Sequence, residues 1–463
     1  MRRAGLSAIA ATLLAGCATQ HPDSLAQVRK LAGEPAALLQ PWQGEDAHAA
    51  ARASVEALLA KPVDADAAVR LAMLHNRSVQ ASLAQLGIAE ADLAQAGRIA
   101  NPGFTLARKR AGDDVEYERR YGIDILGVLT LPWRRQLAEQ EVQQTQFRVA
   151  GEVVRLALQT RKAWINAVAA AQLAGQMGDL AESEATSAEL AKRMQAAGNS
   201  SQLVRDRAHL AALQASAELA RARQGALAAR EQLVRLLGLS GAAATALQLP
   251  DKLPELPAQP RNEAELGGAA DKRLDLQMAR QEVASQARAL GLSRVSRWVN
   301  VLETSYLDNH VGGHSQHGYE LTLELPLFDW GEARVAKAEA IYRQALNRAA
   351  QIGIDAESEL RVSHAAYRSA YKLALQYRDQ MLPLRQAISE QQQLRYNGML
   401  SSVFELMQDS REQLTVAMAS IEAQRAFWEA DAELDMAISA GSIDTPESGK
   451  PAMLPTGSAS RAH

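Results

Sequence analysis

The chain has 463 residues, and its composition is not that of an ordinary globular protein of this length. Aromatic residues make up only 4% and charged residues 22%, a balance that is typical of long helices with exposed faces. The net charge of −3 excludes the basic footprint of a nucleic-acid-binding protein. A single cysteine excludes a disulfide framework and a cysteine-based zinc site.

The amino terminus carries the pattern of an export signal. Met1-Arg2-Arg3 is basic, and an apolar stretch and small residues follow it. Leu14-Ala15-Gly16-Cys17 resembles the bacterial lipobox, which implies that residues 1–16 are a signal peptide and that Cys17 is acylated. Ala18 follows the cysteine, and by analogy with bacterial lipoproteins this favours the outer membrane. A plain signal peptide with a chance cysteine is the alternative.

The next part of the chain predicts an arm, a helix and two strands. Residues 17–63 have scattered proline and glycine and little periodicity, so we expect a lipidated, partly ordered arm. Over 66–99, leucines recur at helical spacing. Apolar and polar residues then alternate over 104–107 and again over 121–131, which predicts two strands joined by a polar loop at 108–119.

A very long helix follows the strands. It begins after Pro132, continues for about 60 residues without proline, and carries a narrow apolar stripe. Gly198 ends it in a tight turn, and another helix is expected over 201–239. Four prolines then mark residues 241–263 as a linker. These elements make residues 64–240 one structural unit.

Residues 264–440 repeat the first unit. Val79-Gln80 recurs as Leu276-Gln277 and Trp133 as Trp330, both at an offset of 197, and Gly198 with Ser201 recurs as Gly398 with Ser401 at an offset of 200. A repeat this long is a duplicated domain half rather than a solenoid unit. The elements expected in it are a helix to about residue 293, strands near 298–307 and 319–325, a long helix to 396, a helix to 439, and beyond it a disordered tail at 441–463.

Helix lengths predict how the elements pack. At 1.5 Å per residue the long helix of each copy spans roughly 90 Å, about the combined length of the two shorter helices. We therefore expect each long helix to run antiparallel to two shorter helices stacked end to end. The proline-rich linker is expected beside their junction.

The last strand has one apolar and one acidic face. Its alternating residues are Tyr319, Leu321, Leu323 and Leu325 on one side, and Glu320, Thr322 and Glu324 on the other. A strand between lipid and a water-filled lumen needs this pattern, although a soluble half-buried sheet gives it too. Four strands leave open edges, so closure requires several chains, and a trimer would form a barrel of about twelve strands. We expect aromatic girdles from residues near the strand ends: Trp298, Tyr306, Tyr319 and Trp330.

Several motifs together resemble the TolC-type outer-membrane factors, the exit ducts of bacterial efflux and secretion machines. They are the lipobox, Asn101-Pro102 before the first strand, Leu325-Pro326-Leu327-Phe328-Asp329-Trp330-Gly331, and the stretch from Asn397 to Leu406. The resemblance covers roughly residues 64–440. It implies a mainly α-helical protomer with a small membrane β-barrel contribution, a homotrimer with a twelve-stranded barrel, and a periplasmic α-helical coiled-coil tunnel. It also implies a periplasmic adaptor and an inner-membrane pump of the resistance-nodulation-division type as partners, with outer-membrane lipid around the barrel.

The resemblance directs attention to the turns at Gly198 and Gly398, which should form the periplasmic tip. Related proteins often carry aspartates just after the second turn as a constriction ring. This chain has Phe404 and Met407 there, with Glu405 and Asp409 nearby. The two acids are four residues apart and share a helix face. They either line the aperture or belong to solvated helix surface, and the surface is the favoured interpretation.

The sequence contains no phosphate-binding loop, no His-Glu-x-x-His motif and no nucleophile–base pairing, so we expect neither an enzyme nor a cofactor. His310, His314 and His317 lie close together in the sequence and could bind a soft cation. We prefer an incidental cluster in an extracellular loop, because only Asp308 is near enough to complete a ligand set.

The sequence therefore predicts a passive outer-membrane channel for small toxic solutes, drugs or heavy-metal cations. One alternative is the exit duct of a type I protein secretion system. Another is a periplasmic coiled-coil adaptor or structural protein, which would show one hairpin flanked by soluble β-domains rather than two hairpins that each follow a pair of strands.

Overall fold

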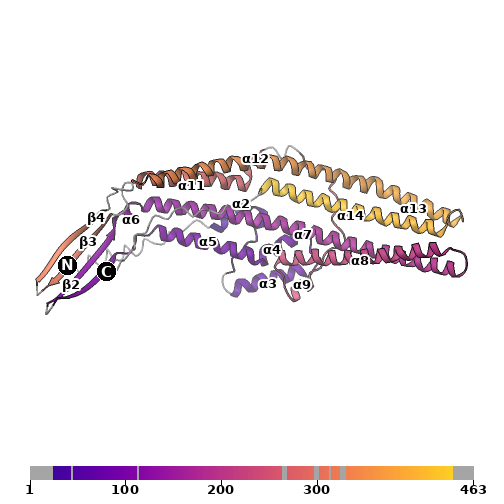
Figure 1. The fold of residues 1–463 in the computed structure, drawn as a ribbon, viewed down its shortest axis with the longest axis horizontal. Coiled ribbons are helices and arrows are strands. Elements are labelled where there is room, and N and C mark those ends of the chain that lie inside the picture. The colour runs from indigo at the N-terminus through magenta and orange to yellow at the C-terminus, as the bar shows by residue number, and fades with distance from the viewer. Residues whose placement is uncertain are drawn as a thin grey trace.

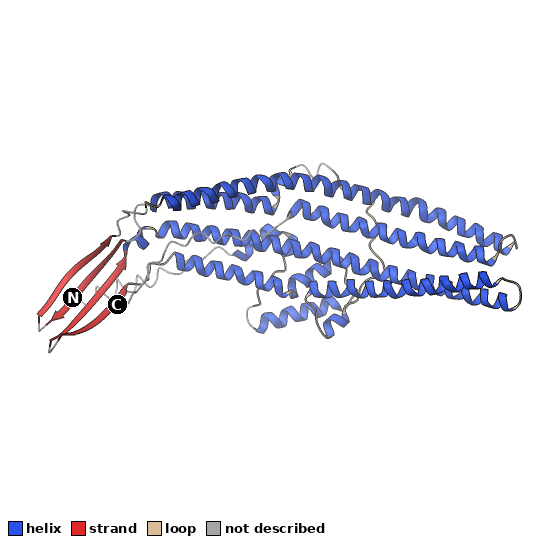
Figure 2. Cartoon of the chain, viewed as in Figure 1, coloured by secondary structure: helices blue, strands red, loops and turns tan. Residues whose placement is uncertain are grey.

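In a computed structural model the protein is elongated, with one small sheet at one end and helices along the rest of its length (Figures 1 and 2). The structure describes residues 24–42, 45–111, 114–262, 268–296, 302–311, 314–323 and 330–441. Within these residues no helix is both long and apolar enough to cross a membrane.

The described part of the amino-terminal arm contains short helices, although its sequence shows little periodicity. Helix α2 (Ser24–Ala32), a 3₁₀ turn (Glu34–Ala36) and α3 (Glu45–Leu59) form within it. Val28, Leu39 and Val55 are buried in the main hydrophobic core. Short helices separated by Gly33 and prolines give little periodicity over a long window, which is why the sequence did not reveal these helices.

The first helix of the first copy is broken where one continuous helix was expected. Helix α4 (Ala65–His75) ends at Asn76, and α5 (Arg77–Ala96) begins there. The side chain of Asn76 accepts a hydrogen bond from the Ser78 amide at 2.7 Å and donates one to the Leu236 carbonyl at 2.7 Å. Asn76 is thus an N-cap that also ties this break to another helix.

The four strands form one antiparallel sheet in the order β1-β2-β3-β4. They are β1 (Gly103–Ala111), β2 (Asp114–Asp124), β3 (Leu302–Val311) and β4 (His314–Leu323). The pairing of β2 with β3 joins the two copies of the repeat edge to edge. The sheet therefore belongs to both copies equally, and each contributes one hairpin.

Two predictions about the strands were wrong. Residues 108–111 and 114–119 are strand rather than loop, because charged side chains pair across β1 and β2, as Lys109 does with Glu118 at 2.8 Å. Residues 125–131 are not strand, because Asp124 caps the short helix α6 (Ile125–Leu129) through the Gly127 amide at 2.8 Å. Strands β3 and β4 lie at 302–311 and 314–323, and Trp298 and the Leu325–Asp329 motif lie outside the described residues.

The long helix of the first copy is continuous. Helix α7 (Leu131–Ala196) has 66 residues, and α8 (Gln202–Leu237) returns along its far half. Helices α4 and α5 pack along its near half, so two shorter elements cover one long one, as the lengths predicted (Figure 1). The linker carries α9 (Ala242–Ala246) and then runs extended beside this junction, where the Val63 amide bonds the Gln248 carbonyl at 2.8 Å.

The second copy repeats this arrangement with an interruption. Helices α10 (Ala269–Lys272) and α11 (Leu274–Ser296) correspond to α4 and α5. The long helix consists of α12 (Glu332–Gln376), a π-helical turn (Tyr377–Met381) and α13 (Leu382–Asn397), which together span 332–397, again 66 residues. Helix α14 (Val403–Ser439) returns along it. Pro383 lies two residues after the π turn, and a proline inside a helix removes a backbone hydrogen bond.

The core is concentrated in the middle of the molecule. The main cluster surrounds Trp164 of α7 and joins the arm, α4, α5, α8 and the linker. The Trp164 indole donates to the Val63 carbonyl at 2.7 Å, which satisfies its buried N–H. A second cluster packs Tyr367 and Tyr371 of α12 against Phe427 of α14. The sheet and the two helical turns extend from opposite ends of this core.

Candidate functional site

The sheet has an apolar face that remains exposed in the single chain. The strand register aligns four aromatic side chains in one row across the sheet: Phe104, Tyr121, Tyr306 and Tyr319. Their neighbouring ring centroids are 5.1 to 6.5 Å apart. Tyr319 is 87% exposed, and Leu321 and Leu323 continue the apolar surface toward the helices. A continuous exposed apolar sheet face of this kind requires an apolar environment or a partner.

The opposite face of the sheet is polar. Glu118 accepts ion pairs from Lys109 at 2.8 Å and from Arg120 at 3.4 Å, and Arg120 also lies 3.4 Å from Glu320. These side chains alternate with those of the aromatic row, so each strand separates the two kinds of side chain by its pleat. One face suits hydrocarbon, and the other suits water.

The sheet is open at both edges. In the described chain, β1 pairs only with β2 and β4 only with β3. Each edge therefore presents a row of backbone N–H and C=O groups that this sheet does not pair. An open edge cannot lie in hydrocarbon, because each unsatisfied backbone group there costs several kcal/mol.

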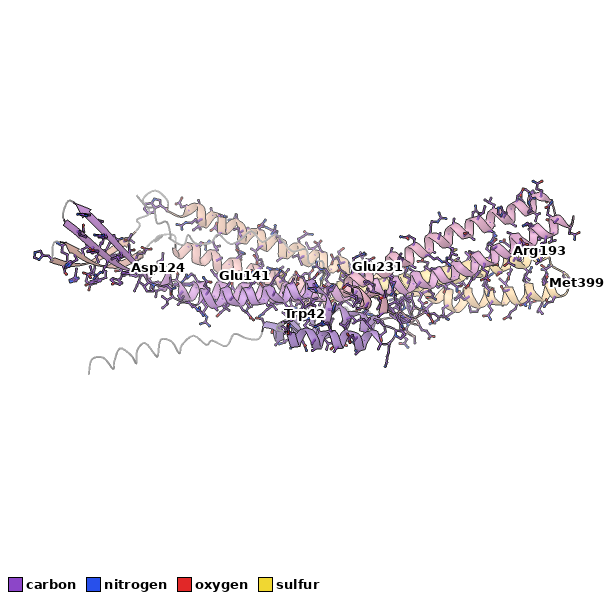
Figure 3. The ribbon with its side chains drawn as sticks, turned by 90° about the horizontal axis from the view of Figure 1, so that it is seen from below. Trp42, Asp124, Glu141, Arg193, Glu231 and Met399 are labelled. Atoms are coloured by element: carbon purple, nitrogen blue, oxygen red, sulfur yellow. The ribbon has the colours of Figure 1, made fainter. Side chains whose placement is uncertain are left out.

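The helical turns lie at the end of the molecule opposite the sheet, as the labelled positions of Asp124 and Met399 show in Figure 3. Their sequence offset is 201, one more than the sequence comparison suggested. Ser201 and Ser402 are the N-caps of α8 and α14. Gly198, with φ of +78°, therefore corresponds to Met399, with φ of +58°, while Gly398 lies just before the left-handed residue.

Glu405 stabilises the second turn. With Ser402 it forms a capping box, in which each side chain accepts a hydrogen bond from the other residue's backbone amide. Its carboxylate accepts hydrogen bonds from the Ser401 hydroxyl at 2.5 Å and from the Ser402 amide at 3.2 Å. These hydrogen bonds lower the pKa of Glu405, so it stays ionised while it remains exposed to solvent.

Asp409 occupies a different environment from the one predicted for it. It is buried between α13 and α14 rather than on solvated surface, because Arg385 binds one carboxylate oxygen at 2.5 Å and the Ser389 hydroxyl binds the other at 2.5 Å. Arg385 also reaches Glu412 at 3.1 Å. One helical turn therefore separates an exposed acid, Glu405, from an acid held inside the second hairpin. Phe404 and Met407 are half-buried on the same helix.

A second ion pair joins the two hairpins. Arg411 of α14 binds Glu184 of α7 through Nε and Nη2, each at 2.5 Å. The pair is bidentate, and Glu184 is buried, whereas the Arg411 side chain is 42% exposed and stays in contact with solvent. Sequence patterns could not reveal this pair, because its two residues are 227 positions apart.

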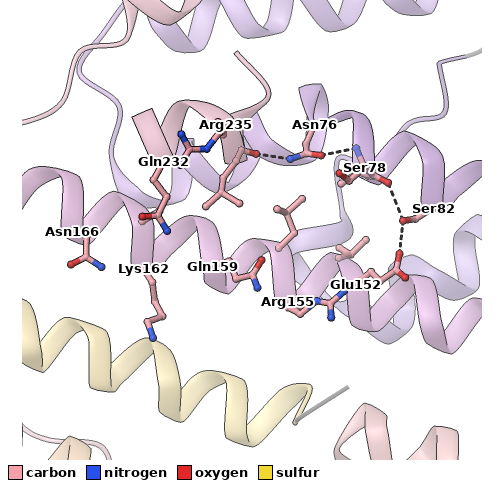
Figure 4. A pocket seen from close by; sticks show the side chains of 15 residues that line it. Asn76, Ser78, Ser82, Glu152, Arg155, Gln159, Lys162, Asn166, Gln232 and Arg235 are labelled. Atoms are coloured by element: carbon pink, nitrogen blue, oxygen red, sulfur yellow. Dashed lines mark hydrogen bonds between the residues drawn. The ribbon is translucent and has the colours of Figure 1, made fainter. Parts of the chain in front are cut away.

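Two polar features lie in the middle of the molecule. An open groove of about 860 Å³ lies between α5, α7 and α8, lined by Glu152, Arg155, Lys162 and Arg235 among others (Figure 4). On the second copy, Arg261 from the linker pairs with Asp431 of α14 at 2.9 Å and also with Asp435. Burial raises the pKa of Asp431 to about 6, although the Arg261 charge opposes this shift.

The three histidines do not share one face of the sheet. They lie in strands β3 and β4 rather than in a loop, and the pleat points His314 to the face opposite His310 and His317. His310 contacts Ser315 at 3.0 Å, and His317 contacts Asp308 at 3.3 Å. Among the residues that the structure describes, no group of three or more His, Cys, Asp or Glu side chains could hold a metal ion.

Comparison with solved structures identifies the fold. No protein-family model matches the chain, and no curated protein matches it by sequence. Solved structures do match: a membrane protein from Pseudomonas aeruginosa (TM-score 0.67, 19% identity, covering 83% of this chain and 93% of that one) and the outer-membrane protein VceC from Vibrio cholerae (0.63, 17%, 84% and 97%). The Campylobacter jejuni CmeC outer-membrane channel also matches (0.63, 14%, 90% and 85%). The chain has the TolC-type outer-membrane channel fold.

The predicted aromatic residues and the predicted lipidation site lie in different parts of the chain. Tyr306 and Tyr319 lie in the middle of β3 and β4 rather than near the strand ends, and the register aligns them with Phe104 and Tyr121, which the sequence reasoning did not connect with them. Trp330 lies at the start of α12, outside the sheet. Cys17 lies outside the described residues, so its acylation remains a prediction.

Proposed function

We propose that the protein is the outer-membrane channel of a tripartite efflux system and conducts small toxic solutes passively. The observation that carries this proposal is the sheet, which has one apolar face, one charged face and two open edges, at the end of long helical hairpins. An outer-membrane barrel needs an apolar exterior and a polar interior, and closure removes its edges.

We propose that three chains close the barrel. The β1 edge of one chain would pair with the β4 edge of the next, a head-to-tail contact that forms a ring. Two chains would give eight strands and three would give twelve; the resemblance to TolC-type factors favours three. The helical part offers matching surfaces, because α8 and the α12–α13 helix lie along opposite long edges of the protomer (Figure 1). Both carry exposed leucines, among them Leu203, Leu210, Leu384 and Leu394.

The helical turns are the proposed contact with a periplasmic adaptor, which would connect the channel to an inner-membrane pump. Met399 is 94% exposed and Leu400 is also exposed, so the second turn presents apolar surface at the end of the molecule. Glu405 is the acid that could line an aperture, while Asp409 would contribute there only if it separated from Arg385. Cys17 would anchor the arm to the membrane by its lipid. We propose no catalytic role and no cofactor.

The direct test is conductance. Detergent-extracted protein reconstituted in planar bilayers should give discrete single-channel steps, and deletion of its gene should raise sensitivity to a drug or a metal ion. Loss of an exported protein without any change in drug or metal sensitivity would favour the secretion duct instead. Intact assemblies that give no conductance under any voltage would contradict the proposal.

A further inference from the structure

Basic side chains continue the apolar face of the sheet toward the hairpin ends. Two residues beyond the aromatic row, the register aligns Leu106, Arg119, Asp308 and His317. The next row contains Arg108, Tyr117 and His310. Each row is about 6.8 Å farther along the strands, because a strand rises about 3.4 Å per residue. These rows lie on the side of the aromatic row that is away from the helices.

Charge is sorted between the two faces in this part of the sheet. In the described residues beyond the aromatic row, the apolar face carries Arg108, Arg110 and Arg119 against one acid, Asp308. The acids Glu116 and Glu118 lie on the opposite face, where Lys109 is the cation that pairs with Glu118. Solubility alone does not require an excess of cations on one face of the hairpins. The excess of arginines on the apolar face therefore indicates a specific role.

The two central arginines keep donors available. Arg108 lies over the Tyr117 ring, with its guanidinium carbon 5.8 Å from the ring centroid, a contact that orients the side chain without using its N–H groups. Arg119 lies 3.4 Å from Asp308, which His317 also contacts at 3.3 Å. One carboxylate shared in this way cannot use the five donors of a guanidinium. Both arginines are exposed.

We propose that Arg108 and Arg119 form a binding site on the outer wall of the barrel for the phosphate groups of a bis-phosphorylated glycolipid of the lipid A type. This inference rests on the proposed function, because the apolar face must meet lipid. Aromatic rows mark the interface between hydrocarbon and headgroups, so the next rows lie at the depth of the headgroups. The hairpin ends are farthest from the helices, which places them in the external leaflet. Arginine binds phosphate bidentately, whereas a cation at hydrocarbon depth would be costly.

The chain offers a matched control. Lys109 and Arg120 are the direct sequence neighbours of Arg108 and Arg119, and they project from the opposite face of the same strands. The double variant Arg108→Gln with Arg119→Gln therefore removes two charges from the lipid-facing surface. The control, Lys109→Gln with Arg120→Gln, removes two charges from the other face.

The experiment is native mass spectrometry of the full-length protein in detergent, titrated with bis-phosphorylated lipid A, monophosphorylated lipid A or phosphatidylglycerol. We expect the lipid-face variant to lose about tenfold or more in affinity for bis-phosphorylated lipid A, while the control changes by less than about twofold. Wild-type protein should prefer the bis-phosphorylated form over both other lipids.

If the samples contain trimers, three results would overturn the proposed site. They are unchanged binding in the lipid-face variant, an equal loss of binding in the control, and equal binding of phosphatidylglycerol. Monomers in every sample, wild type included, would refute the barrel itself and the site with it. The two failures are therefore distinguishable in the same spectra.

Discussion

The two copies of the repeat share one architecture but differ in the chemistry of their buried polar groups. Among the described residues of the first copy, the buried polar side chains are neutral except Glu184, which pairs with Arg411 of the second copy. Those of the second copy are all charged: Arg273, Asp275, Asp409 and Asp431. The duplicated backbone has thus been stabilised in two ways, by neutral hydrogen bonds in one copy and by ion pairs in the other.

The break in the first helix of each copy shows this difference at one position. Asn76 in the first copy corresponds to Arg273 in the second, at the offset of 197. Asn76 bonds the Leu236 carbonyl, whereas Arg273, only 1% exposed, binds Asp275 at 2.7 Å and Glu359 at 2.7 Å. Each break also meets a left-handed glycine at the end of the returning helix, Gly238 or Gly441.

Removing the ion pair should have the largest effect. Arg273→Ala leaves Asp275 buried without its partner, and we expect a loss of about 3–5 kcal/mol in unfolding free energy. Asn76→Ala should cost only about 1–2 kcal/mol, because it removes a cap and one neutral hydrogen bond. Thermal and urea unfolding followed by circular dichroism would measure both. Equal losses at the two positions would show that the copies are not stabilised differently.

The stability of the second copy should depend on pH through Asp431. Since the pKa of Asp431 is raised to about 6 in the folded protein, folded protein binds its proton more tightly than unfolded protein does. Ionised Asp431 therefore lowers stability above pH 6, and this penalty disappears as the pH falls below the ordinary value near 4. The loss of unfolding free energy caused by ionised Asp431 is at most roughly 3 kcal/mol.

Asp431→Asn should consequently reduce the loss of melting temperature that wild type shows between pH 4 and pH 7. The matched variant Asp435→Asn changes the more exposed partner of Arg261 and should leave that part of the profile in place. Identical pH profiles for wild type and Asp431→Asn would show that burial does not perturb this carboxyl.

A side chain at Gly238, at the end of α8, should destabilise the protein. Gly238 has φ of +71°, and a Cβ there would lie 2.8 Å from the His75 carbonyl oxygen. Gly238→Ala should cost about 2 kcal/mol, from the left-handed conformation and the backbone collision. Gly198→Ala is the control, because Gly198 is also left-handed but its Cβ would meet open space. If both variants lost the same stability, the close approach to α4 would contribute nothing.

The smallest effect is expected at the tip. Met399 occupies the left-handed position that Gly198 occupies in the first copy. This conformation is less favourable in free energy for methionine than for glycine. Met399→Gly should stabilise the second turn by less than about 1 kcal/mol, measured as slower amide exchange over residues 394–406. Faster exchange would mean that the Met399 side chain itself stabilises the turn.

The sequence predicted the parts of this structure that depend on local patterns. Helical periodicity and the proline-free run after Pro132 gave the long helices, and alternation gave the apolar row around Tyr319. Strand residues 108–111 and 114–119 were missed, because their stability comes from cross-strand ion pairs such as Lys109–Glu118 rather than from alternation. The buried position of Asp409 depends on Arg385, 24 residues away on another helix, so helical spacing alone could not reveal it.

The central claim is that the open edges of β1 and β4 close between chains. Native mass spectrometry of the detergent-extracted full-length protein, with circular dichroism to confirm that strands are present, tests it most directly. The account predicts three chains in each particle. A stable monomer that keeps its strands folded in lipid would contradict it.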